Sequence, residues 1–190
     1  MQGVGIELIL GQIAGAIALA FLISTYFKKD KISIAKTMLI SNIFYILHYF
    51  LIGALSGCYA LVVALLRDYY ILLREKHHKK YRHRALYNNS LVFIGIFAIY
   101  FCLIIINFNE PLNILPPFAG LLYFTFEWFG NRFLVKLSSG TASSMWLAYD
   151  ITNFSVPGII TDVLSIVACI IGLLKDRRRG RRKPHKRHKK

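Results

Sequence analysis

Residues 5–27 read GIELILGQIAGAIALAFLISTYF, and this run ends at the cluster Lys28, Lys29 and Lys31. A helix needs about 20 apolar residues to cross the roughly 30 Å hydrocarbon layer of a bilayer, so the run predicts a membrane-spanning helix. The 190-residue chain is 56% hydrophobic, with a mean hydropathy of +0.50. A soluble domain of this length could not bury so much apolar surface. The run has no positively charged segment before it, which favours a retained helix over a cleaved signal peptide.

Six further apolar segments follow, and together they predict an all-α, polytopic membrane helix bundle of about seven helices over residues 1–174. The later spans cover about residues 32–52, 54–73, 90–106, 117–130, 133–151 and 157–174. The segment 107–117 is rich in proline and asparagine. Proline cannot continue a helix interior, so this segment is predicted to be a loop. Residues 175–190 have no apolar side chain to bury and are predicted to form a disordered basic cytoplasmic tail.

The basic residues predict how the chain is oriented. Six Lys/Arg lie between Arg74 and Arg84, and eleven of the 24 lie in residues 175–190. With the N-terminus outside, every basic segment falls on the cytoplasmic side, where Lys and Arg are enriched. The outside segments then hold Glu7, Glu110 and Asp150 without any Lys or Arg. Six helices would put one basic segment on the wrong side, which favours counting the Ser- and Gly-rich span 133–151.

Two triplets of helices on either side of residues 90–106 show similar local patterns. Gly15 corresponds to Gly120, Lys36 to Lys136, and Gly57 to Gly158, at offsets of 105, 100 and 101 residues. An odd helix between two triplets gives both the same orientation. The pattern therefore indicates a 3+1+3 parallel repeat, an architecture of small transporters, with repeat one at about 5–73, a linker helix at 90–106 and repeat two at about 117–174. Chance similarity between apolar helices is the alternative.

Polar and aromatic residues form a stripe on two helices of this repeat. On the second helix the stripe spans about 120° at 100° per residue, and Ile, Leu and Phe occupy the opposite arc. The candidate solute-binding residues are Asn42, Tyr45, His48 and Tyr49 on this stripe, and Ser143, Trp146, Asp150 and Asn153 on the sixth helix. Polar groups at membrane depth tend to face a bundle interior or a wet cavity. A central cavity for a neutral or zwitterionic solute is one interpretation, and interhelical hydrogen bonding alone is the other.

Three further polar residues at membrane depth have two interpretations each. Arg67 either snorkels toward the headgroups or pairs with another helix. Its neighbour Asp68 diverges from it by about 100° on the helix, so the two are not expected to pair across a helix face. Asp162 is either a carboxylate favoured by the helix dipole or a functional group, so Arg67 and Asp162 are candidates for ion coupling or structure. His48 either titrates or forms structural hydrogen bonds. Glu127 is expected to be interfacial.

The basic tail predicts contact with anionic lipid at the inner leaflet, where each cation near the surface contributes about 1 kcal/mol. The residues expected to make this contact are Arg177, Arg178, Arg179, Arg181 and Arg182. Nucleic acid is disfavoured as a partner because no aromatics are interleaved with the cations. Neither a metal, a cofactor nor an enzyme is predicted: the histidines at 77, 78 and 83 lie among cations, and no nucleophile or phosphate-binding motif is present. Self-association stays open.

Several short motifs resemble the YgjV-like family of bacterial inner-membrane proteins. They are Gly11-Gln12-Ile13-Ala14-Gly15, Ser24-Thr25-Tyr26, Ser41-Asn42-Ile43-Phe44, His48-Tyr49 and Arg67. This family looks distantly similar to the PQ-loop group, which includes the SWEET sugar transporters, although a Pro-Gln pair is missing here. The resemblance covers most of residues 5–175 and implies an inner-membrane 3+1+3 bundle, with solute transport by analogy. A membrane scaffold without a permeation pathway is the alternative function.

Overall fold

The computed structural model describes residues 4–25, 27–28, 31–81, 90–129 and 132–181. Within these ranges the chain forms seven α-helices and no strand, which confirms the all-α prediction. The helices are α1 Val4–Thr25, α2 Lys31–Leu51, α3 Leu55–Tyr81, α4 Ser90–Ile106, α5 Pro111–Phe129, α6 Arg132–Thr152 and α7 Val156–Arg181.

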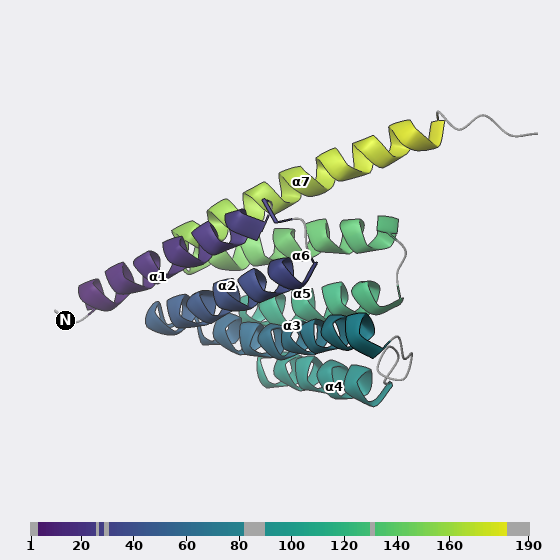
Figure 1. The fold of residues 1–190 in the computed structure, drawn as a ribbon. Helices are drawn as coiled ribbons and strands as arrows, with labels where there is room; N and C mark the ends of the chain where they lie inside the picture. Colours follow the sequence, from purple (N-terminus) through teal and green to yellow (C-terminus); the bar gives the residue numbers. More distant parts are fainter. Residues whose placement is uncertain (1–3, 26, 29–30, 82–89, 130–131, 182–190) are drawn as a thin grey trace, which may run out of the picture.

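Six of the helices form a ring and α4 lies outside it (Figure 1). In chain order α1 packs on α2 and α2 on α3, and in the same way α5 packs on α6 and α6 on α7. Contacts of α3 with α5 and of α1 with α7 join the two triplets. Among the described helices α4 contacts α3 and α5, and it returns the chain so that α5 runs in the same direction as α1.

The two triplets are alike in detail at the turn between their second and third helices. α2 and α6 each have 21 residues, and α3 and α7 each begin four residues after them. A residue with positive φ follows the end of α2 and of α6: Gly53 at 77° and Phe154 at 54°. The following N–H groups reach back to the helix: Ala54 N to Tyr49 O at 2.9 Å, and Ser155 N to Asp150 O at 3.0 Å. Such left-handed residues satisfy the last carbonyls of a helix, and their equivalent positions support the predicted repeat.

The proline-rich segment differs from its prediction, because α5 starts at Pro111 and contains Pro116 and Pro117. A proline inside a helix leaves the carbonyl four residues earlier without its usual N–H partner. For Pro117 this carbonyl belongs to Asn113, and it accepts a hydrogen bond from the Ser56 hydroxyl of α3. The predicted loop is therefore wrong from Pro111 onward, since a neighbouring helix replaces the missing donor.

Two helices, α3 and α7, continue well beyond their predicted C-terminal ends. α3 continues to Tyr81 and α7 to Arg181, beyond the expected ends at residues 73 and 174. Their apolar parts, Leu55–Leu73 and Val156–Lys175, correspond closely to the predicted spans. Lys, Arg, Glu and Leu are good helix formers, so both helices extend past the apolar stretch. Residues 175–181 of the predicted disordered tail are thus helical, and residues 182–190 lie outside the described part.

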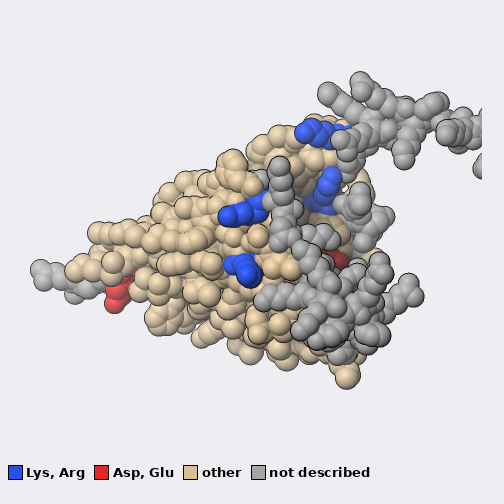
Figure 2. Space-filling model, in the orientation of Figure 1, with Lys and Arg blue, Asp and Glu red and all other residues tan. Residues whose placement is uncertain are grey.

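The outer surface of the bundle is apolar. Large side chains such as Ile43, Phe50 and Ile106 are 53%, 62% and 75% exposed, as expected where lipid replaces water. Four helices (α1, α2, α3 and α7) are long and apolar enough to cross a membrane, and α4 is a shorter apolar helix. Figure 2 shows the Lys and Arg side chains on the half of the bundle away from the start of α1. One acidic side chain lies near the start of α1, and another lies toward the opposite end. The structure is that of a helical membrane bundle.

Candidate functional site

The polar stripe of α2 faces the interior of the ring, as the sequence predicted. Ser41, Tyr45, His48 and Tyr49 are buried, and Asn42 is half-buried. The opposite arc carries the exposed side chains of Ile40, Ile43, Leu47 and Phe50. A helix in lipid keeps its polar groups on the side where other helices or water satisfy them, which fixes the rotation of α2.

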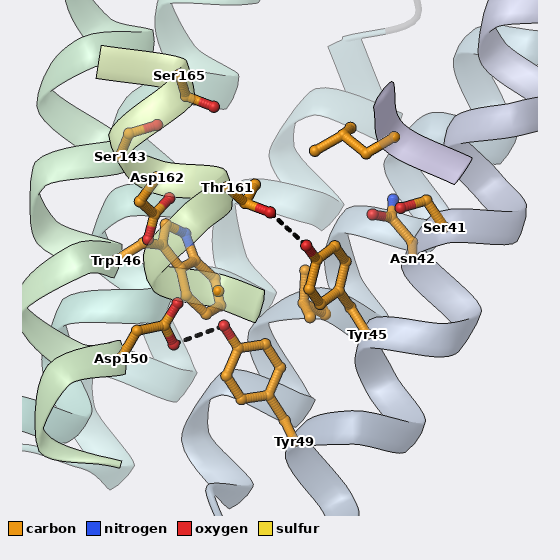
Figure 3. A pocket seen from close by; sticks show the side chains of 13 residues that line it. Ser41, Asn42, Tyr45, Tyr49, Ser143, Trp146, Asp150, Thr161, Asp162 and Ser165 are labelled. Atoms are coloured by element: carbon orange, nitrogen blue, oxygen red, sulfur yellow. Dashed lines mark hydrogen bonds between the residues drawn. The ribbon is translucent and has the colours of Figure 1, made fainter. Parts of the chain in front are cut away.

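A cavity of about 220 Å³ lies between this stripe and the second triplet (Figure 3). Its wall is formed by Leu22, Ser41, Asn42, Tyr45, Tyr49, Leu61, Ser143, Trp146, Asp150, Gly158, Thr161, Asp162 and Ser165. We call it the first cavity. Asn42 and Trp146, candidates from the two predicted stripes, both line it. Six of the eight candidate solute-binding residues therefore share one space.

A second cavity of about 240 Å³ adjoins the first on the side of α3 and α5. Both cavities are lined by Asn42, Leu61, Ser143 and Trp146. The wall of the second cavity adds Arg67 and Asp68 from α3 and Tyr123 from α5. The ring of helices thus contains two neighbouring spaces that share these four side chains as part of their walls.

Hydrogen bonds and ring contacts join the two triplets across the first cavity. The Tyr49 hydroxyl donates to Asp150 Oδ1 at 2.6 Å, and Tyr45 shares a hydrogen bond with the Thr161 hydroxyl. The ring centroids of Tyr49 and Trp146 are 5.6 Å apart. A 2.6 Å O–H···O contact has the length of a charge-assisted hydrogen bond. The α2 side chains therefore hold α6 and α7 by both polar and aromatic contacts.

Asp150 lies in a different environment from the one predicted by topology. The charge pattern placed it among the outside segments, but its side chain is 1% exposed and lies inside the bundle. Gly158 makes this possible, because a Cβ atom at that position would overlap the Asp150 carboxylate. The correspondence of Gly158 with Gly57 was visible in the sequence, but its role beside a carboxylate was not.

His48 has a structural role in this arrangement rather than a place in the cavity wall. Its Nδ1 lies 2.7 Å from the Gly11 carbonyl and its Nε2 lies 2.8 Å from Ser155 Oγ. A carbonyl only accepts, so Nδ1 carries the proton and Nε2 accepts from the Ser155 hydroxyl. A Cβ on Gly15 would come within 2.9 Å of the ring, so this glycine allows α1 to approach it. The histidine therefore joins α1, α2 and the start of α7.

Asn153 is also absent from the two cavities. Its side-chain amide donates to the Tyr149 carbonyl at 2.9 Å and lines a separate pocket at the end where α3 and α5 begin. The sixth helix ends at Thr152, so Asn153 belongs to the turn and not to the stripe. Tyr149 is a buried residue of α6 that was not among the predicted site residues. Its hydroxyl accepts a hydrogen bond from the Gly57 N–H at 3.0 Å.

Arg67 is buried and paired with its neighbour. Its Nε and Nη2 both lie 2.8 Å from Asp68 Oδ1, and Glu127 is 3.8 Å away. The Asp68 carboxylate also accepts a hydrogen bond from Asn42 at 2.8 Å. The prediction that the two neighbours cannot pair is wrong: their Cβ directions diverge, but the long guanidinium side chain folds back, and a buried cation needs a partner. The guanidinium also lies 5.1 Å from the Tyr123 ring centroid.

The position of Asp162 bears on the helix-dipole interpretation. It is the seventh residue of α7, beyond the first turn, and it is 7% exposed in the wall of the first cavity. Interaction with a helix dipole falls off within the first turn, so that interpretation is not supported.

The side chains of the tail arginines from Arg177 to Arg182 lie outside the described part of the structure, and their predicted lipid contacts stay predictions.

The fold and these internal polar contacts define a multi-helix membrane protein whose largely apolar and aromatic core also contains buried polar and charged side chains. The sequence model of the Imp-YgjV family, described as bacterial inner membrane protein, matches residues 9–180. The chain therefore belongs to this family and is an inner-membrane protein. No curated protein and no solved structure matches the chain.

Proposed function

We propose that this protein transports a small neutral or zwitterionic solute through the cavity between its two helix triplets. The observation that carries the proposal is the composition of the first cavity wall: α2 of one triplet and α6 and α7 of the other supply polar and aromatic side chains to one space. Small-molecule sites are typically apolar and aromatic pockets with a few convergent polar groups. Contacts that only hold the two triplets together would not need a cavity between them.

The charges around the cavities favour a zwitterion among these solutes. The first cavity presents the carboxyl groups of Asp150 and Asp162, and the second presents Arg67 beside Asp68. A molecule with both a cationic and an anionic group could place its cationic group near the two aspartates and its anionic group near Arg67, with Trp146 and Asn42 between them. Each cavity is smaller than the usual range of about 300–1,000 Å³ for ligand pockets, so the solute is expected to be small.

The proposal includes an orientation and a lipid partner. With the N-terminus outside, the cluster of Lys and Arg at one end of the bundle faces the cytoplasm, as positive charge in short loops normally does. The basic continuation of α7 would then lie beside the anionic inner leaflet.

Ligand-induced thermal stabilisation tests the proposal. Purified protein is screened against a panel of small neutral and zwitterionic metabolites, and at least one compound should raise its Tm. Asn42→Leu should abolish that shift, whereas Asn153→Leu, the same change in a turn outside the cavities, should retain it. If Asn42→Leu does not fold, Ser143→Ala replaces it, because Ser143 lines both cavities. A scaffold without a permeation pathway would give no shift, or a shift unaffected by either cavity variant.

A further inference from the structure

Two carboxyl groups meet in the wall of the first cavity. Asp150 on α6 and Asp162 on α7 lie within hydrogen-bonding reach of each other, one above the other in Figure 3. They are 1% and 7% exposed. Asp150 Oδ1 accepts the Tyr49 hydroxyl, but Asp150 Oδ2 and Asp162 Oδ2 are buried with no hydrogen-bond donor among the described residues.

Among the described residues, two hydroxyl groups near the pair have other acceptors. Ser155 lies within hydrogen-bonding reach of Asp150, but when His48 is neutral the Ser155 proton is donated to His48 Nε2, because Nδ1 carries the imidazole proton and donates to Gly11. Tyr45 lies nearby and shares its hydrogen bond with Thr161. An ionised carboxylate only accepts hydrogen bonds, so contact between two of them becomes a bond only when one carries a proton.

Among the described residues, the ionisable groups that contact the pair directly are not cations, and His48 of α2 reaches Asp150 only through the Ser155 hydroxyl. α2 presents Tyr45 and Tyr49, and α6 adds Tyr149. α3 presents Arg67, but this guanidinium is bound to Asp68 and lines the second cavity. The described part of α1 holds one acidic residue, the exposed Glu7 near its start, and no cation. Two negative charges within hydrogen-bonding reach of each other in a low-dielectric interior repel strongly, as they do in paired catalytic carboxylates.

We propose that Asp150 and Asp162 form a one-proton site, in which a single proton bridges the two carboxyl groups and exchanges with water in the first cavity. With the proton bound, the pair carries one negative charge, and the O–H of one carboxyl donates to the other. Release sends the proton to water and leaves two negative charges, which push α6 and α7 apart at this level. The occupied site therefore holds the two helices together.

Infrared spectroscopy of the purified protein over a pH titration tests the site, with the proton itself as the probe. A protonated carboxyl group has a C=O stretch separate from the carboxylate bands, and this stretch shifts in D₂O. The wild type should show such a band, and it should disappear at alkaline pH. Asp162→Asn and Asp150→Asn should each abolish the band, because the amide N–H then supplies the donor and the remaining aspartate stays ionised.

Asp68→Asn is the matched control, since Asp68 is also a buried carboxylate but is bound to Arg67 and Asn42. The band should persist in that variant. Absence of the band in the wild type, or its persistence in both Asn variants at half intensity, would overturn the one-proton site. Should one of the two Asn variants fail to fold, the other decides, because either one removes the shared proton.

The coupling of this proton to solute movement rests on the proposed function. If the solute shifts the charge state of the pair, the thermal shift given by the strongest compound of the panel should depend on pH in the wild type and lose that dependence in Asp162→Asn. A pH-dependent band without any ligand shift would retain the proton site and reject transport. A ligand shift without the band would do the reverse.

Discussion

Replacing Tyr49 by phenylalanine removes one oxygen atom from the interior of the bundle and keeps the ring that packs on Trp146. The lost hydrogen bond is 2.6 Å long and ends on Asp150. Tyr49 is 3% exposed and Asp150 is 1% exposed, so bulk solvent does not reach this bond, although both residues line the first cavity. Hydrogen bonds to charged groups contribute about 1.5–3 kcal/mol in soluble proteins. Interhelical bonds in a membrane protein average about 0.6 and reach about 1.7 kcal/mol, so a loss of about 1.5 kcal/mol is expected.

Tyr45→Phe is the matched control, because Tyr45 lies one turn away and bonds a neutral hydroxyl, Thr161. We expect it to cost about 0.6 kcal/mol, the average for an interhelical hydrogen bond in a membrane protein. Reversible unfolding in mixed micelles, with the free energy taken from the denaturant midpoint, measures both variants. A loss of about 1.5 kcal/mol corresponds to roughly a tenfold change in the unfolding equilibrium. Equal losses for the two variants would show that the Asp150 carboxylate does not depend on Tyr49, and the account of the seam between the triplets would be wrong.

Three other predictions follow from the fold. Reporter fusions after Leu174 should be active only with a cytoplasmic reporter, and activity of a periplasmic reporter there would reverse the proposed orientation. Deletion of the residues after Asp176 should leave the Tm within a few degrees of the full chain and weaken binding to vesicles that contain anionic lipid, whereas loss of the folded bundle would contradict a lipid-binding role alone. Gly120→Ala should destabilise by about 1–3 kcal/mol, because its Cβ would come within 2.5 Å of the buried Tyr100 ring, whereas Gly95→Ala, with open space around it, should be neutral in the same unfolding assay.

Helix positions and the face of α2 could be predicted because both depend on local composition. A bilayer requires long apolar spans, and a polar stripe must turn away from lipid, so Tyr45, His48 and Tyr49 could be placed inside before any neighbour was known. The repeat helped for the same reason, since the offset of 101 residues relates Tyr49 to the Asp150 carboxylate that its hydroxyl contacts.

The features that escaped prediction depend on contacts between distant segments. Pro117 is tolerated inside α5 because Ser56, on another helix, bonds the carbonyl that the proline leaves free. Asp150 and Asp162 were read as separate residues with separate roles, because nothing in their spacing shows that the turn around Phe154 brings them together. Arg67 was assigned by helix-face geometry, which describes Cβ directions and not the reach of a long side chain.

The closure of the ring between α1 and α7 has a consequence for biosynthesis. Gln12 on α1 donates a hydrogen bond to the Phe154 carbonyl, and His48 on α2 shares a hydrogen bond with Ser155, which lies just before α7. The first helices to leave the ribosome therefore obtain these partners only after most of the chain has been made. Unsatisfied polar groups in hydrocarbon cost several kcal/mol each. The nascent helices must consequently be sheltered from lipid, by the insertion machinery or by one another, until the last helix arrives and closes the seam.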